Sequence, residues 1–332
     1  MTFSGFKACR IYRDRGVIEN RMEQLTLEDL SPGEVVIKNC YSSINYKDAL
    51  AVTGRGKIIR NYPLIPGIDL VGVVESSEDN RFVSGDEVLV NGCGMGEKHN
   101  GGFAQYARIP ADWIIPLPKG LSPLESMVLG TAGLTAALCL HRMENNGQSP
   151  EQGPVVVTGA SGGVGSIAIS MLTGLGYEVI AVSGRESQFD YLSLLGAAQV
   201  VKSETLELTA QSLQNARFAG IIDNVGGELL ASLLASVLPW GNVASVGMAA
   251  DPKFSATVFP FILRGVSLLG VSSSNCPMPV RRRLWDRLSK DLKPEHLDKI
   301  ISDIVSLDDL NSVCSELLDR ERHGRIVVDC RS

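Results

Sequence analysis

A glycine-rich segment in the middle of the 332-residue chain is the clearest candidate for chemistry. The segment Val155–Gly165 reads VVVTGASGGVG, with a glycine at every third position from Gly159, and an apolar helix pattern follows over 167–172. Glycines at this spacing permit a tight turn and let backbone N–H groups approach a pyrophosphate at the start of a helix. We therefore expect a dinucleotide-binding turn, and its phosphate contacts are expected from Ser161, Gly162, Gly163 and Val164.

The end of the next strand indicates which dinucleotide this turn binds. An NAD enzyme has an Asp or Glu about 20 residues past the glycine motif, where it binds the ribose 2′-hydroxyl. This chain has Ser183-Gly184-Arg185 there, and a guanidinium with a hydroxyl suits a 2′-phosphate that a carboxylate would repel. We predict NADPH as the cofactor, with a further phosphate contact from Lys202 or Ser203. In the alternative interpretation, Arg185 is a solvated surface residue and Glu186 binds the ribose.

Two later loops should end at the same crevice as the glycine-rich turn, because the carboxyl ends of parallel strands lie at one edge of a sheet. These loops are Asn224–Gly227 and Gly247–Ala249. We expect them to line the nicotinamide half of the cofactor site, with Met248 and, at the end of the next strand, Val271 as contacts.

The elements that would hold this site fall into two patterns. Up to about residue 120, short β-branched runs such as Glu34–Lys38 and Leu70–Glu75 alternate with Pro-Gly and Gly-Asp turns, which is typical of an antiparallel barrel. From Pro154 onward, apolar strands alternate with helix-length segments, which predicts a doubly wound parallel sheet. The strands of that sheet are expected at 155–157, 178–182, 199–201, 220–223, 242–246 and 267–271.

Local patterns also mark where helices begin and where the chain returns. Ser122, Pro123 and Glu125 form a capping box that predicts a helix start. An amphipathic helix is predicted from the apolar stripe of Leu310, Val313, Cys314, Leu317 and Leu318. A further strand is expected at 326–328, after the parallel sheet is complete, and it could therefore return to the first domain. We expect an α/β chain with a β-barrel domain at 1–125 and 276–332 and a parallel-sheet Rossmann domain at 126–275.

Composition narrows the class of partner. Lys and Arg number 31 against 37 Asp and Glu, so the net charge of −6 gives no field to attract nucleic acid. The first ten residues lack the apolar core of a signal peptide, and no later segment has the uninterrupted apolar run of a membrane span. The seven cysteines are scattered without a CxxC spacing, which predicts reduced thiols. We expect a soluble, cytoplasmic enzyme acting on a small molecule.

The order of a barrel, a nucleotide-binding domain and a return strand resembles the medium-chain dehydrogenase/reductase superfamily, whose first domain is GroES-like, over the whole chain. Zinc alcohol dehydrogenases of that superfamily carry a Cys-His pair, a Gly-His-Glu and a further Cys or acid as zinc ligands. The corresponding segments here are Asn45–Asp48, Pro66–Asp69 and Gly130–Gly133, which keep only Asp69 as a candidate ligand. The structural zinc lobe is reduced to one Cys and one His over 91–99. We therefore expect no metal.

Within the superfamily, the chain is similar to the NADPH-dependent acrylyl-CoA reductases of the quinone-oxidoreductase-like branch. The segments that carry this similarity are Ser43–Leu50, Thr53–Pro63, Ile65–Asp69, Thr158–Gly165, Ser183–Ser187, and Phe261–Arg264 before Pro277. One departure is Val271-Ser272-Ser273, because the family usually has an acidic residue before the Ser of this strand.

The resemblance implies that NADPH reduces propenoyl-CoA (acrylyl-CoA) to propanoyl-CoA without a metal. Tyr46 is then the expected polar group at the nicotinamide, both as a cofactor contact and as a donor to the enolate, with water as the alternative acid. Asn45 could be a second donor to the thioester oxygen, or it could cap a local turn. Arg325 matches a family position near the cofactor.

A small basic cluster and the quaternary state complete these expectations. Arg55, Lys57 and Arg60 are candidates for binding the phosphates of coenzyme A, and the alternative for each is a solvated loop residue. For the whole chain, the alternative functions are a broad quinone or enal reductase and a low-turnover NADPH-binding adaptor. We expect a homodimer in which the strand at 267–271 extends a sheet across a two-fold axis.

Overall fold

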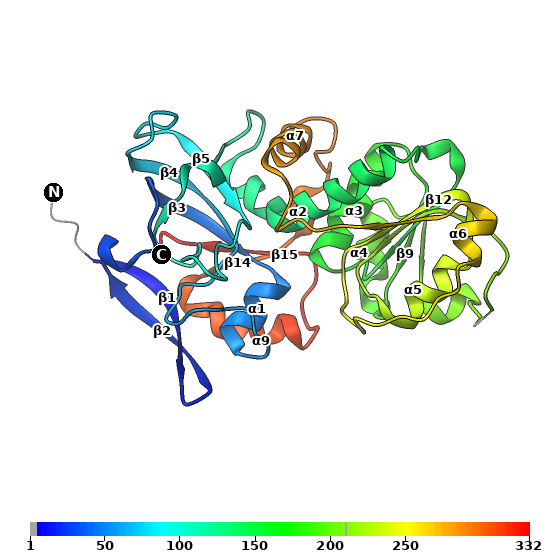
Figure 1. The fold of residues 1–332 in the computed structure, drawn as a ribbon, viewed down its shortest axis with the longest axis horizontal. Coiled ribbons are helices and arrows are strands. Elements are labelled where there is room, and N and C mark those ends of the chain that lie inside the picture. The colour runs from blue at the N-terminus through cyan, green and yellow to red at the C-terminus, as the bar shows by residue number, and fades with distance from the viewer. Residues whose placement is uncertain (1–4, 210) are drawn as a thin grey trace. The chain divides into compact units, whose positions relative to one another are not determined.

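The computed structural model describes residues 5–209 and 211–332 of the chain. These residues form two compact units, each with an apolar core of its own (Figure 1). The first unit comprises residues 5–131, Ser274–Ser289 and Ile301–Ser332. The second unit comprises Ala132–Ser273 and Lys290–Ile300. The first unit therefore extends six residues beyond the expected boundary at residue 125. Lys290–Ile300, which was expected in the first domain, belongs to the second unit.

The first unit is an α/β unit built around a barrel-like sheet. Within the described residues this sheet has the strand order β14-β15-β3-β4-β5-β7, and β6 pairs with β3. Its strands are β3 (Val35–Ile44), β4 (Asp69–Ser77), β5 (Glu87–Asn91), β6 (Tyr106–Ile109), β7 (Ile115–Pro116), β14 (Ile301–Ser306) and β15 (Arg325–Asp329). The late strand β15 pairs antiparallel with β3, which places Val327 opposite Ser43. The predicted return of the chain to the first domain is confirmed.

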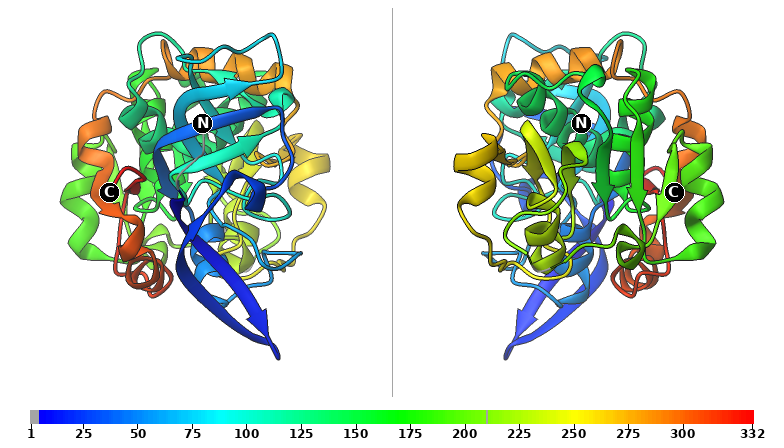
Figure 2. Two further views of the ribbon diagram at one scale, coloured as in Figure 1. Left: turned by 90° about the vertical axis from the view of Figure 1, so that its left-hand side faces the viewer. Right: turned by 90° about the vertical axis from the view of Figure 1, so that its right-hand side faces the viewer.

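Five strands of this unit were not predicted, namely the short strands β6 and β7, the strand β14 and the two strands of an N-terminal hairpin. The hairpin of β1 (Phe6–Asp14) and β2 (Val17–Leu25) forms a separate two-stranded sheet, drawn in dark blue in Figure 2. Nearly all of β2 is exposed or half-buried. Because most of this strand is not packed in a core, its sequence VIENRMEQL lacks the strict alternation of apolar and polar residues from which a strand is predicted. The strand β14 pairs parallel with β15, and Asp303 and two serines interrupt its apolar pattern.

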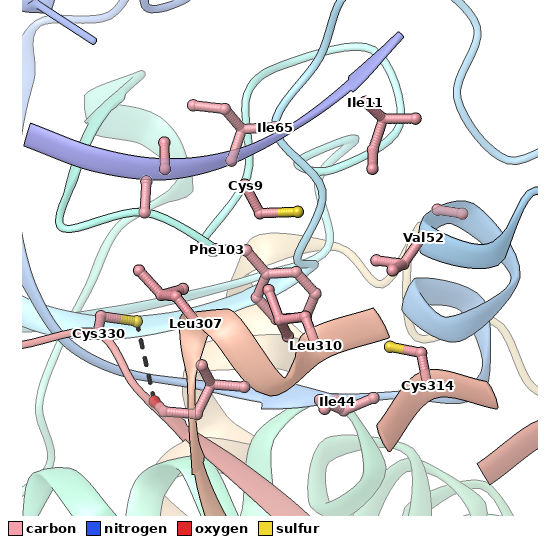
Figure 3. Packing of buried hydrophobic residues seen from close by; sticks show 14 of the residues in the cluster. Cys9, Ile11, Ile44, Val52, Ile65, Phe103, Leu307, Leu310, Cys314 and Cys330 are labelled. Carbon is pink, nitrogen blue, oxygen red and sulfur yellow. Dashed lines mark hydrogen bonds between the residues drawn. The ribbon is translucent and has the colours of Figure 1, made fainter. Parts of the chain in front are cut away.

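The core of the first unit fixes the position of its short helices. The helices are α1 (Tyr46–Thr53), α7 (Met278–Leu288) and α9 (Leu310–Leu318). Figure 3 shows Val52 of α1 and Cys314 of α9 in one cluster with Cys9 and Ile11 of β1, arranged around Phe103. The predicted stripe is confirmed in that Leu310, Val313 and Cys314 are buried. This packing holds α1 in place.

The second unit is a doubly wound parallel sheet. In the part of the chain that the structure describes, its order is β10-β9-β8-β11-β12-β13, with every pair parallel. The strands are β8 (Val155–Thr158), β9 (Val179–Val182), β10 (Gln199–Val201), β11 (Phe218–Asp223), β12 (Val237–Ser245) and β13 (Ser267–Gly270). The helices are α3 (Gly163–Gly174), α4 (Phe189–Leu194), α5 (Gly227–Leu234), α6 (Phe259–Arg264) and α8 (Leu297–Ile300). All six predicted strands are confirmed. This order is that of the Rossmann fold, whose ligands bind where the strand order reverses.

The helix α2 (Pro123–Glu144) begins at the predicted capping box. The Ser122 N–H donates to Glu125 Oε2 at 2.8 Å, and the Glu125 N–H donates to Ser122 Oγ at 3.2 Å. The helix is interrupted at Gly130, which has φ 48° and ψ −149°. Among the described residues, α2 is the one helix long and apolar enough to cross a membrane, and most of its apolar stretch is buried inside the protein. Such burial is typical of a core helix.

Candidate active site

The glycine-rich turn of the second unit has the geometry of a phosphate-binding turn. Gly159 has φ +57°, and a Cβ on Gly165 would lie 2.5 Å from the Gly159 carbonyl oxygen. Gly162 is exposed and caps α3, and a Cβ there would have no atom closer than 3.4 Å. The first and last glycines therefore serve the turn and the close packing of α3, while the middle one leaves the helix N-terminus open to an anion. Gly163 and Val164 form the first residues of α3.

Arg185 lies beside this turn within the same unit. Its Nη2 donates to Ser161 Oγ at 3.1 Å, and its backbone N–H donates to Ser183 Oγ at 3.3 Å. Ser161 and Ser183 are buried, Arg185 is half-buried and Gly184 is exposed. The predicted cofactor residues after β8 and β9 therefore lie together. The guanidinium of Arg185 is thereby held next to the glycine-rich turn.

The carboxylate of Glu186 is occupied by a lysine. Lys202 Nζ lies 2.7 Å from Glu186 Oε1, and this exposed ion pair lowers the pKa of Glu186 and raises that of Lys202. Ser203, the other expected contact after β10, donates its hydroxyl to Glu204 at 3.0 Å. Met248 is 70% exposed, and Val271 is half-buried, with its N–H donating to the Ser245 carbonyl at 3.0 Å.

Sequence reasoning missed a buried network that joins the ends of β8 and β11. Thr158 Oγ1 donates to Asp223 Oδ1 at 2.7 Å, and the Gly226 N–H donates to Asp223 Oδ2 at 2.9 Å. Asn224 bonds back to Thr158 through its N–H and its Nδ2. Burial raises the pKa of Asp223. Polar residues at the carboxyl ends of neighbouring parallel strands were the available signal; the network shapes the loop that faces Gly159.

The first unit contains a second polar site, centred on Asp69 at the start of β4. This carboxylate is fully buried and accepts five hydrogen bonds from protein donors. The donors are Ser43 Oγ at 2.7 Å, Asn45 Nδ2 at 2.8 Å, Asn91 Nδ2 at 2.7 Å, Thr131 N at 2.9 Å and Thr131 Oγ1 at 2.5 Å. Arg325 Nη2 lies 3.8 Å from Asp69 Oδ2. A Cβ on Gly130 would lie 2.6 Å from the same oxygen, so the break in α2 makes room for the carboxylate.

The side chains of Asn45 and Arg325 both form hydrogen bonds within this network. Asn45 Nδ2 donates to both Asp48 and Asp69, and Asn45 Oδ1 accepts from Arg325 Nη1 at 3.1 Å. Both amide hydrogens are therefore used, and Asn45 forms the capping box of α1 with Asp48. The structure therefore shows the turn-capping role that was the alternative for Asn45, and its role as a donor to a thioester stays a prediction.

Arg325 is likewise held by the protein's own atoms. Its side chain is 3% exposed and donates to Val128 O at 3.0 Å, Ile44 O at 3.1 Å and Ser43 Oγ at 2.7 Å. Burial lowers the pKa of this guanidinium, and the carboxylates of Asp69 and Asp48 oppose that effect. Arg325 therefore balances the charge of Asp69 inside the unit, and its expected contact with a cofactor stays a prediction.

Asp48 and Tyr46 lie in the first turn of α1. Asp48 is buried and accepts from Asn45 N at 2.9 Å and Ile68 N at 2.9 Å, while burial and the nearby Asp69 raise its pKa to about 7. The N-cap to N3 spacing of Asn45 and Asp48 was the signal that could have assigned it. Tyr46, in contrast, is 56% exposed. The network therefore fixes the backbone from which the Tyr46 phenol projects.

The donor set around Asp69 does not fit a zinc ion. Zinc in proteins takes three or four Cys, His or carboxylate ligands, whereas Asp69 is surrounded by hydroxyl, amide and guanidinium donors. Over residues 5–209 and 211–332, no three His, Cys, Asp or Glu side chains come together to hold a metal ion.

The expected substrate residues Arg55, Lys57 and Arg60 all have exposed side chains after α1. Arg55 Nη1 lies 2.6 Å from Asp319 Oδ1, beyond the end of α9. The Arg60 N–H donates to the Glu97 carbonyl at 2.9 Å. Exposure leaves these cations accessible to an anionic ligand, although Arg55 already has a carboxylate partner.

Comparisons with known proteins agree with this architecture. Residues 31–119 match the family "Alcohol dehydrogenase GroES-like domain", and residues 163–290 match "Zinc-binding dehydrogenase". The chain is 43% identical over 327 residues to acrylyl-CoA reductase AcuI of Ruegeria pomeroyi, covering 98% of this chain and 99% of the relative. It is 46% identical over 324 residues to the Bacillus subtilis protein named "Putative quinone oxidoreductase YhfP", with coverages of 97% and 98%.

Two solved structures resemble this chain over nearly their full length. The Salmonella enterica yhdH oxidoreductase in complex with NADP superposes with a TM-score of 0.94 at 44% identity, covering 97% of this chain and 99% of that one. Bacillus subtilis yhfP with NAD bound has a TM-score of 0.96 at 46% identity, with coverages of 98% and 100%. The chain therefore belongs to the medium-chain dehydrogenase/reductase superfamily, in the quinone-oxidoreductase-like branch that includes the acrylyl-CoA reductases.

Proposed function

We propose that this protein is an NADPH-dependent oxidoreductase that reduces the activated C=C bond of propenoyl-CoA and forms propanoyl-CoA. The observation that carries the proposal is the hydrogen bonding of Asp69, whose carboxylate accepts from five protein donors. Asp69 lies in the segment that corresponds to a zinc-ligand segment of the zinc alcohol dehydrogenases. A reaction that needs no Lewis acid suits such a site. Reduction of an enoyl thioester meets this condition, because the negative charge develops on an oxygen that O–H donors can stabilise.

The choice of NADPH is supported by the surroundings of Arg185. Its guanidinium lies 3.1 Å from Ser161 Oγ of the phosphate-binding turn, where a 2′-phosphate would find a bidentate partner. Glu186, the alternative ribose ligand, is bound to Lys202 at 2.7 Å. We propose that Ser183, Gly184, Arg185 and Ser203 surround the 2′-phosphate. The NADP complex of the Salmonella relative supports this proposal, and the NAD complex of the Bacillus relative makes the comparison with NADH necessary.

When bound, NADPH supplies the hydride that adds to the β-carbon of the substrate. The C=C electron pair then resides on the thioester enolate, and a proton must reach the α-carbon. Tyr46 is our candidate for this step, because its phenol is exposed and its backbone is fixed by the capping box below it. Its O–H either donates a hydrogen bond to the enolate oxygen or transfers the proton, with water as the alternative acid.

The coenzyme A portion of the substrate carries phosphates that need cationic partners. Lys57 and Arg60 offer exposed cations next to α1. Arg55 would have to exchange Asp319 for a phosphate, which an exposed ion pair permits because such pairs contribute little stability. We propose these residues as the substrate's phosphate contacts.

A broad quinone or enal reductase is the second candidate, and the similarity to the Bacillus protein named as a quinone oxidoreductase favours it. A third candidate is a protein that binds NADPH with little turnover, since one fold serves several roles. These candidates differ in which acceptor oxidises NADPH.

The test follows NADPH oxidation at 340 nm with propenoyl-CoA, crotonyl-CoA and a benzoquinone, repeated with NADH and with a chelator. We expect turnover of propenoyl-CoA that favours NADPH over NADH and does not change with the chelator. Turnover confined to the quinone would favour the broad reductase, and binding of NADPH without any turnover would favour the adaptor. A Tyr46→Phe variant that keeps the full kcat would assign the proton transfer to water.

We also propose a homodimer formed through the edge of the parallel sheet. β13 lies at the end of the strand order, and Val258, Ile262 and Leu263 near it are each more than 60% exposed. Burying such residues against a second copy removes apolar surface from water. Sedimentation equilibrium should give twice the chain mass, and an Ile262→Glu variant should dissociate the dimer.

A further inference from the structure

Lys47 follows Tyr46 in the first turn of α1 and makes contacts that the proposed chemistry does not use. Its Nζ lies 2.8 Å from Glu97 Oε1 and 3.1 Å from Ser274 Oγ. The exposed fractions are 32% for the Lys47 side chain and 21% for that of Glu97. Because the pair is partly buried, salt and solvent screen its attraction less than that of a pair on the surface. The ion pair therefore holds the Lys47 ammonium in one position.

The three residues come from segments that are far apart in the sequence. Glu97 belongs to the loop after β5, Ser274 begins the segment that leads to α7, and Lys47 lies on α1. The loop is itself anchored, because the Arg60 N–H donates to Glu97 O at 2.9 Å and the Glu97 N–H donates to Gly94 O at 3.2 Å. Lys47 therefore ties α1 to two segments that are held independently.

Ser274 is held from a second side by Arg281 of α7, which is buried. Arg281 Nη2 donates to Ser274 O at 3.3 Å, and its Nη1 donates to Asn91 O at 2.6 Å. The Asn91 side chain in turn donates to Asp69. Ser274 is therefore connected to the first turn of α1 by two routes, one through Lys47 and one through Asn91, Asp69 and Asn45.

A helix as short as α1 has little stability of its own, so side-chain contacts decide the position of its first turn. Asn45 holds one side of that turn through Asp48 and Asp69. We propose that Lys47 holds the other side, and that it acts as a positioning residue for Tyr46 through its ion pair with Glu97 and its bond to Ser274. This inference rests on the proposed function, because it assigns Lys47 a role in placing the phenol of that reaction.

The alternative is that Lys47 itself donates the proton or contacts the substrate. Its charge is already balanced by Glu97 at 2.8 Å, which argues for a structural use of the ammonium. An arginine distinguishes the two roles, because it can keep the ion pair but does not release a proton near neutral pH. Lys47→Arg therefore retains activity only if Lys47 positions Tyr46.

The experiment compares Lys47→Met, Lys47→Arg and Glu97→Gln with wild type. Methionine keeps most of the apolar stem and removes the charge. Lys98→Met is the matched control, since Lys98 is an exposed lysine of the same loop. Two quantities are measured: kcat and the KM for NADPH with whichever acceptor the wild type reduces, and amide hydrogen exchange of the peptide over 44–54, which needs no turnover.

We expect Lys47→Met and Glu97→Gln each to lower kcat about 10- to 100-fold, as a misplaced reacting group does. The KM for NADPH should change less than kcat does, because Tyr46 is only one of the expected cofactor contacts and those of the glycine-rich turn lie in the second unit. Exchange over 44–54 should become faster in both variants, Lys47→Arg should restore kcat to within about threefold of wild type, and Lys98→Met should change neither quantity. The double variant should be no worse than either single one, because the pair acts as a unit.

Three results would overturn the proposal. An inactive Lys47→Arg variant with wild-type exchange would make Lys47 a catalytic residue. Faster exchange with an unchanged kcat would make the pair purely structural, and unchanged exchange in Lys47→Met would show that the contact does not hold α1. Failure of the proposed function is recognised separately, as a wild type that does not reduce propenoyl-CoA; kcat is then measured with the acceptor that the wild type does reduce, and the exchange measurement still decides whether Lys47 holds α1.

Discussion

Replacing Asp69 by Asn tests whether its carboxylate is the centre of a hydrogen-bond network. The two side chains have the same shape, so the change preserves packing and removes one acceptor and one charge. Three of the donors around Asp69 are N–H groups that cannot become acceptors: Asn45 Nδ2, Asn91 Nδ2 and Thr131 N. In either orientation, the new amide nitrogen faces at least one of them.

The size of the effect follows from these contacts. A buried donor left without an acceptor costs about 1–3 kcal/mol, and the guanidinium of Arg325, 3.8 Å away and 3% exposed, loses its counter-charge. Breaking a buried ion pair from one side costs about 3–5 kcal/mol. Because the two terms overlap, we expect Asp69→Asn to lower the free energy of unfolding of the first unit by about 3–5 kcal/mol. The melting temperature should fall by about 6–20 °C.

Urea unfolding followed by tryptophan fluorescence measures this effect. Trp113 and Trp285 lie in the first unit, so the experiment is done in a Trp240→Phe background, which removes the signal of the second unit. Asp112→Asn is the matched control, because its carboxylate is 82% exposed and pairs with Arg81 on the surface; it should cost less than about 0.5 kcal/mol. A chelator should leave both midpoints unchanged. Equal midpoints for the two variants would refute the network, and a midpoint lowered by the chelator would indicate a metal.

Three further outcomes are expected. Arg185→Ala should lower kcat/KM for NADPH about 10- to 150-fold, because a charge-assisted hydrogen bond contributes about 1.5–3 kcal/mol. The kcat/KM for NADH should not change, and equal losses with both cofactors would contradict the assignment of Arg185 to the 2′-phosphate. Gly165→Ala should lower thermal stability by at least about 1–3 kcal/mol, because its Cβ would lie 2.5 Å from a carbonyl oxygen, whereas Gly174→Ala, with no atom within 4 Å, should not destabilise. Burial raises the pKa of all seven thiols, so Ellman's reagent at pH 8 should modify native protein only at the half-buried Cys40 and Cys93; rapid reaction of a third thiol would contradict this shielding.

The buried thiols also bear on the proposed substrate. Enoyl thioesters react with thiolates, and a raised thiol pKa keeps the thiolate fraction low at neutral pH. Five of the seven cysteines are buried and two are half-buried. An enzyme that handles such an electrophile gains from having its own thiols shielded, and this arrangement is consistent with the proposed reaction.

The sequence alone determined the features that depend on local order and period. The six strands of the second unit, the glycine-rich turn and the position of Arg185 after β9 all follow from spacing along a strand–turn–helix pattern. The capping box at Ser122 and the stripe on α9 are equally local. Each of these signals is contained within about 30 residues, so no knowledge of the tertiary structure is needed to read it.

Only the tertiary structure decided what the polar residues near Tyr46 do. Asn45 was expected either to contact a ligand or to cap a turn and Arg325 to contact a cofactor, and the structure shows that their hydrogen bonds go to Asp69, Asp48 and Ser43. The pairing of β15 with β3 brings Arg325 beside Ser43, which is 282 residues away in the chain. A polar side chain inside a protein must bond to whatever lies beside it, and what lies beside it is set by strand order rather than by sequence spacing. The role of a buried polar residue therefore becomes visible only once the sheet is assembled.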